Sequence, residues 1–203
     1  MAILTANNQS LTEITALPSV ITTGSMVLLE TETASSSSTL DFTSGIDSTY
    51  DEYVFKFYDI HPSHASTDFQ FNGSIDAGSN YNVTKTTSSF KAAHDEGDSD
   101  TTLSYSASHD LAQGTGFQNL ASYGNSDNGN DSCLAGTLYL FNPSSTTLVK
   151  HFIARTNYVA NTPYSVDTFM AGYFNTTSDI DAIQFKFSAN NIDAGVIKLY
   201  GVV

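Results

Sequence analysis

The chain has 203 residues and carries seven Lys and Arg against 21 Asp and Glu, which gives a formal net charge of −14. Nucleic-acid binding depends on cationic contacts to phosphate, so this charge excludes nucleic acid as an expected partner. The single cysteine, Cys133, excludes an intrachain disulfide. An apolar run of about 18 residues and a basic N-terminal region are both missing, so neither a membrane span nor an export signal is expected.

Residues 1–33 are predicted to form an extended attachment arm, because they are polar, carry scattered Leu and Ile, and show no sustained helical period. Residues 26–29 within this arm are a short apolar run suited to a buried strand. The run of serines at 35–38 is typical of a connector or an exposed turn. Residues 34–203 are predicted to form the folded domain.

The domain is predicted to be all-β, because apolar alternation recurs between clusters of Gly, Asn, Asp and Ser. The clearest strand is 52–60, where Tyr53, Phe55 and Phe57 fall on one face. Further strands are expected at 39–43, 67–72, 81–91, 101–106, 135–142, 147–157, 166–175, 181–188 and 195–202. Strands without helical crossovers pair antiparallel, so we expect an antiparallel β-sandwich of jelly-roll type.

Two segments between these strands need separate treatment. Residues 111–122 are the one helix candidate, but Gly114 and Gly116 favour an irregular backbone. Residues 142–145 supply turn chemistry between two β-rich runs, which predicts a hairpin. Both faces of this hairpin carry apolar residues, so we expect it to be central or covered by a neighbouring subunit.

Acidic loops provide the candidates for cation binding. Asp95, Glu96, Asp98 and Asp100 concentrate the oxygen donors that calcium prefers, although no EF-hand pattern is present. Solvated loop tips are the alternative interpretation, so no cofactor is expected unless this loop holds a structural Ca²⁺. A second set, Asp59, His61, His64 and Asp68, has donors for a transition metal but lacks the spacing of a known zinc motif.

Catalytic signatures are weak in this sequence. Ser108, His109 and Asp110 are adjacent, and neighbouring side chains point apart, so they do not form a triad. Residues 114–116 lack the GK[ST] ending of a phosphate-binding loop. We therefore expect no enzyme activity.

Tyrosines in loops carry the remaining functional signal, because exposed tyrosines stack on sugar rings or anchor protein interfaces. Residues 158–164, YVANTPY, are the predicted contact loop, with Tyr158, Asn161 and Tyr164 as its binding residues. Core packing is the alternative role for each tyrosine. The other tyrosines considered for such contacts are Tyr81, Tyr123 and Tyr173.

Three segments resemble a known group of proteins: SSSSTLDFTSGIDSTYDEYVFKFYDIHP at 35–62, LFNPSSTTLVKHFIAR at 140–155 and GYFNTTSDIDAIQFKFSANNIDAGVIKLYGV at 172–202. They are similar to virion structural proteins of tailed bacteriophages, especially marine phages of cyanobacteria. The closing GVIKLYG resembles the end of many tail-fibre and virion β-domains. These motifs are signatures of strands and turns, and they carry over no catalytic residue.

The resemblance implies a β-sandwich subunit of the virion, placed in a tail, a fibre or a capsid decoration, and assembled in the host cytoplasm. Its expected partners are other virion proteins, and a homotrimer is the simplest assembly. The alternative function is a carbohydrate-binding module that recognises glycans on the host surface. A hydrolase is the least favoured of the three hypotheses.

Overall fold

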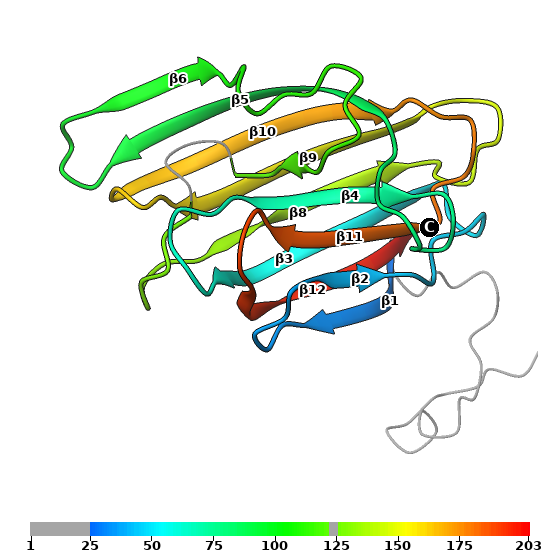
Figure 1. Cartoon of the computed structure of the whole chain (residues 1–203), viewed down its shortest axis with the longest axis horizontal. Helices are drawn as coiled ribbons and strands as arrows, with labels where there is room; N and C mark the ends of the chain where they lie inside the picture. Colours follow the sequence, from blue (N-terminus) through cyan, green and yellow to red (C-terminus); the bar gives the residue numbers. More distant parts are fainter. Residues whose placement is uncertain (1–24, 122–125) are drawn as a thin grey trace, which may run out of the picture.

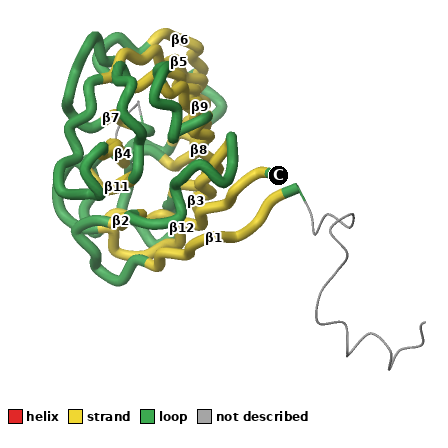
Figure 2. Tube along the Cα trace, turned by 90° about the vertical axis from the view of Figure 1, so that its right-hand side faces the viewer, coloured by secondary structure: helices red, strands yellow, loops and turns green. Residues whose placement is uncertain are grey.

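The computed structural model describes residues 25–121 and 126–203, which form two antiparallel β-sheets packed as a sandwich. This confirms the predicted fold class. Figure 2 looks along the strands and shows the two layers side by side. No helix within the described ranges is long and apolar enough to cross a membrane.

The large sheet has eight strands and the small sheet has four (Figure 1). In spatial order, the large sheet contains β1 (Met26–Thr33), β12 (Ile192–Val202), β3 (Glu52–Pro62), β8 (Leu134–Phe141), β9 (Lys150–Val159), β10 (Tyr164–Phe174), β5 (Lys85–Asp95) and β6 (Thr101–Tyr105). The small sheet contains β2 (Leu40–Phe42), β11 (Ala182–Phe187), β4 (Phe69–Ser74) and β7 (Gln118–Asn119).

Eight of these strands follow the order of a jelly roll. β1-β12-β3-β8 lie next to one another in the large sheet, and β2-β11-β4-β7 form the small sheet. The remaining strands, β9, β10, β5 and β6, are added beside β8 and widen the large sheet alone. The large sheet therefore has an extension, which we define as β9, β10, β5 and β6, on which much of the candidate site lies.

Phenylalanine side chains fill the space between the sheets. Phe55 and Phe57 point inward from β3 and meet Phe69 and Phe185 of the small sheet. These rings are almost completely excluded from solvent. Aromatic residues suit pleated surfaces that are buried on one face, which is why the aromatic strand predicted at 52–60 becomes β3, at the centre of the jelly-roll part.

The β8–β9 hairpin forms as predicted, and Leu138 and Leu140 face the core while Tyr139 and Phe141 face outward. Asn142 adopts a positive φ of 45° in its turn, a conformation that asparagine tolerates better than most residues. Both strands lie inside the large sheet with neighbours on each side. The first of the two expected arrangements, a hairpin in the middle of the sheet, is confirmed. That a neighbouring subunit covers its outer face stays a prediction.

The expected arm differs from the structure in its second half. Met26–Thr33 form β1, which pairs with β12 along its whole length and belongs to the sandwich. Leu29 of the apolar run at 26–29 packs against the core, so the arm boundary at residue 33 is too late. Residues 1–24 lie outside the described ranges. Residues 111–121 have an irregular backbone apart from a β-bridge between Gly114 and Lys85 and the short β7.

Tyr53 fixes the loop before β3 through its hydroxyl group, which is the basis of a prediction. The hydroxyl donates to the carbonyl oxygen of Asp47 at 2.9 Å and accepts from the amide of the same residue at 3.0 Å. We expect Tyr53→Phe to lower the free energy of unfolding by about 0.5–1.5 kcal/mol, measured by urea denaturation. An unchanged midpoint would show that water replaces the hydroxyl without cost.

Candidate functional site

The predicted contact loop is only partly at the surface. Tyr158 points into the core and is 1% exposed, so the proposal that it contacts a ligand is wrong. Its position on β9 explains this, because β9 alternates strictly and residue 158 shares the inward face with Phe152 and Ala154. Asn161 donates to Ser66, and the Tyr164 hydroxyl donates to Asp100 at 3.0 Å.

The acidic loop after β5 is held by its own hydrogen bonds. The Asp95 carboxylate accepts from the hydroxyl and amide of Ser99 and from the amide of Asp100, and these bonds lower its pKa to about 2. The Asp98 carboxylate lies 3.2 Å from Nε2 of His94. The backbone amide of Glu96 donates to the carbonyl oxygen of Pro163. The acidic loop is thus hydrogen-bonded to the contact loop at residues 163 and 164. Its carboxylates are not grouped to hold a metal ion.

The second set of candidate metal ligands is also dispersed. Asp59 and His61 line a surface depression of about 470 Å³ together with Cys133 and Asp193, whereas His64 and Asp68 lie elsewhere. Burial raises the pKa of Asp68 to about 6 and also raises that of the Cys133 thiol. Across residues 25–121 and 126–203, no group of three or more His, Cys, Asp or Glu is arranged to hold a metal ion.

The outer face of the large sheet, which points away from the small sheet, carries the strongest surface signal. Among the residues that the structure describes, nine large apolar side chains are exposed, and six of them lie on this face. Such a concentration is typical of a surface that another molecule covers. The six residues are Leu28, Tyr58, Phe90, Leu103, Tyr105 and Ile153.

Two aromatic rings stack across neighbouring strands of the extension, and we call this stack the platform. Phe90 of β5 and Phe169 of β10 are directly opposite in register, and their rings stack with centroids 4.8 Å apart at an angle of 2°. The Arg155 guanidinium lies over the other side of Phe169, 4.6 Å from its centroid. Arg155 is in turn oriented by Asp167, with an Nη2–Oδ2 distance of 2.6 Å. This arrangement presents a rigid, nearly uncharged surface.

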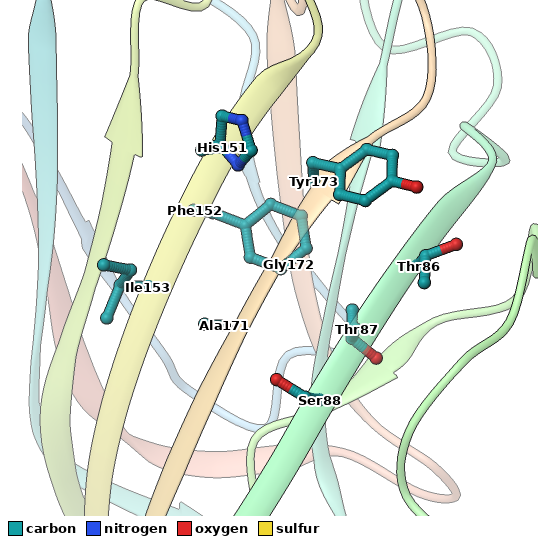
Figure 3. A pocket seen from close by; sticks show the side chains of 9 residues that line it. All are labelled: Thr86, Thr87, Ser88, His151, Phe152, Ile153, Ala171, Gly172 and Tyr173. Atoms are coloured by element: carbon teal, nitrogen blue, oxygen red, sulfur yellow. The ribbon is translucent and has the colours of Figure 1, made fainter.

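A depression of about 450 Å³ lies beside this platform over β10. Ala171 forms part of its floor, because its methyl group is the smallest side chain between the larger Tyr173 and Phe169 on the outer face of the strand. Figure 3 shows His151 and Tyr173 at one end, Ile153 on one side, and the hydroxyl groups of Thr86 and Ser88 on the other. The rings of His151 and Tyr173 are 5.8 Å apart.

A smaller depression of about 150 Å³ continues from Ala171 to Phe90 and Phe169. Outward residues of one strand are about 6.6 Å apart, so the run from Tyr173 to Phe169 spans about 13 Å. We call this run of two depressions the β10 groove. Its lining contains no carboxylate, lysine or arginine.

Of the tyrosines considered from the sequence, only Tyr173 lies in this groove. Tyr123 lies outside the described residues, and Tyr81 is half-buried, with a pKa that burial raises to about 12. The sequence indicated a contact on the outer face through the apolar residues on both faces of the β8–β9 hairpin. It did not indicate Phe90 on β5 and Phe169 on β10, because which residues of two strands lie opposite each other depends on the register between the strands.

Comparison with known proteins adds no relative to this description. The search found no matching protein-family model, no matching curated protein and no matching solved structure.

Proposed function

We propose that the chain is a structural subunit of a tailed-bacteriophage virion, and that it acts by surface contact rather than by catalysis. The observation that carries the proposal is the uncovered outer face of the large sheet, which presents most of the exposed large apolar side chains of the described residues. The assignment to a virion, in contrast, is supported by the sequence resemblance to virion β-domains.

The extension supports this proposal because it enlarges the outer face beyond what the sandwich needs. β9, β10, β5 and β6 widen one sheet only, and Phe90, Leu103 and Tyr105 on them are 46%, 75% and 56% exposed. Leaving such side chains in water forgoes the gain from burying them, on the order of 1.5–3 kcal/mol for each large residue. A contact partner that covers them recovers this free energy.

Charge also favours the outer face as the contact surface. Three of the seven cationic residues, Lys56, Arg155 and Lys198, lie there. The carboxylates among the described residues of that face are Glu52 and Asp167 within the sheet and Asp59 and Asp193 at the end of β3 and β12, a smaller excess than the 21 against seven of the whole chain. The chain as a whole has a charge of −14, so most of its remaining surface repels acidic neighbours. Contacts between several copies, such as the expected homotrimer, should then strengthen with salt, because screening weakens that repulsion.

The test is to locate the chain in purified particles of the phage that encodes it, by mass spectrometry and particle reconstruction. We expect a fixed copy number in the tail, fibre or capsid, and at least about tenfold less incorporation of Phe90→Asp, because a charge at the centre of a contact is costly. Leu148→Asp is the matched control, since Leu148 is 65% exposed in the β8–β9 turn. Particles that lack the chain would refute the proposal.

A further inference from the structure

We propose that the β10 groove binds a neutral oligosaccharide. This rests on the proposed function, in which the outer face is the contact surface, and it names the class of molecule that occupies one part of that face.

The size and the lining of the groove suit a sugar ring. The depression over Ala171 has a volume of about 450 Å³, which lies in the range of small-molecule sites of about 300–1,000 Å³. A pyranose has an apolar face of C–H groups and a rim of hydroxyl groups. Tyr173 and Ile153 offer apolar surface for the C–H face, while Ser88 and His151 offer hydrogen-bonding groups for the rim. The Thr86 hydroxyl already accepts from Gln113, so it can add a donor only.

The charge of the lining selects among sugars. An anionic glycan would need a permanent cation such as lysine or arginine in the groove, and a cationic ligand would need a carboxylate, but the lining has neither. The nearest charges, Arg155 and Asp167, already neutralise each other at 2.6 Å. The groove therefore favours neutral sugars over sialylated or sulfated ones.

The length of the groove indicates more than one ring. From Tyr173 the floor runs past Ala171 to the stacked Phe90 and Phe169 rings, a distance of about 13 Å along the strand. A sugar at Ala171 would thus continue past the edge of Phe169, whose faces are covered by Phe90 and Arg155, toward the half-exposed ring of Phe90. The strand ladder holds these rings in place, so binding requires little ordering of the protein.

The experiment uses the full chain with an array of neutral oligosaccharides, followed by titration of the best one, with sialyllactose as the anionic comparison. We expect millimolar or tighter binding of at least one neutral oligosaccharide and weaker binding of sialyllactose. Tyr173→Ala should reduce the affinity at least about tenfold by removing the aromatic wall, and Ala171→Leu should do the same by filling the floor.

Two further variants separate stacking from general damage. Tyr173→Phe keeps the ring and should retain most of the affinity. Tyr58 lies on the outer face away from the groove, so Tyr58→Ala should retain the full affinity for the oligosaccharide. Circular dichroism and thermal midpoints of each variant check the fold.

Three results would overturn the inference. One is an array on which no neutral oligosaccharide binds, and another is binding that Tyr173→Ala and Ala171→Leu leave unchanged. The third is sedimentation showing self-association that Tyr173→Ala disrupts, which would make a second copy of the chain the occupant. If any of these is found while the chain is present in particles, the inference fails and the proposed function stands.

Discussion

Phe185→Ala is expected to destabilise the folded chain by about 3–5 kcal/mol, which is a large share of the roughly 5–15 kcal/mol that is typical of single domains. Phe185 is fully buried on β11, and its ring centroid lies 5.2–6.3 Å from those of five other phenylalanines. Two of them, Phe55 and Phe57, belong to the opposite sheet, so the cavity left by alanine would lie between the two sheets. The other three are Phe42, Phe69 and Phe71.

Urea denaturation followed by near-ultraviolet circular dichroism measures this effect, since the signal depends on fixed aromatic packing. Leu148→Ala provides the surface comparison and should change the stability by less than about 0.5 kcal/mol. A loss below about 1 kcal/mol for Phe185→Ala would mean that the surrounding rings collapse into the cavity. The core would then be less rigid than the ring geometry indicates.

The sequence predicted the strands well because their signal is local. Tyr53, Phe55 and Phe57 alternate with residues of the other face, and the Gly, Asn and Ser clusters mark where each strand ends. β1 was assigned to the arm because residues 1–33 were judged by their polar character, although the apolar run at 26–29 already suited a strand. Its place in the sheet depends on pairing with β12, which is far away in the chain.

The candidate site was less accessible from sequence, for the same physical reason. Tyr158 lies beside a loop, but it is an even number of residues from Phe152 on the same strand. Alternate residues of a strand point to the same side of the sheet, so Tyr158 points into the core like Phe152. Phe90 and Phe169 lie far apart in sequence, so their stacking appears only once the β5–β10 register is known. The alternation within β10 does place Tyr173 on the outer side, but not which neighbours it meets.

The stability of the chain is expected to rise between about pH 7 and pH 9.5, because it buries lysines. Lys85 is fully buried on β5, where its Nζ donates to the carbonyl oxygens of Gly116 at 2.7 Å and Val83 at 3.0 Å. Burial lowers its pKa to about 7. Lys150, on the other side of Phe174 in register, donates to Thr176, and burial lowers its pKa too.

The direction follows from which state holds more protons. An unfolded lysine has a pKa of about 10.4, so above pH 7 the unfolded chain keeps a proton that folded Lys85 has lost, and raising the pH favours folding. The slope approaches about 1.4 kcal/mol per pH unit for one such group. Below this window Asp68 titrates, with a pKa of about 6. Above it Tyr81 acts oppositely, because its pKa of about 12 lets the unfolded state ionise first.

Urea unfolding at pH 7.5, 8.5 and 9.5 tests this pH dependence, and a gain on the order of 2 kcal/mol across the series is expected. In Lys85→Met most of the slope should disappear, while Lys198→Met on the outer face should keep it. Flat stability in the parent chain would show that the two carbonyl oxygens hold the Lys85 ammonium charged despite its burial. In that case the hydrogen bonds, rather than the loss of hydration, would decide its protonation.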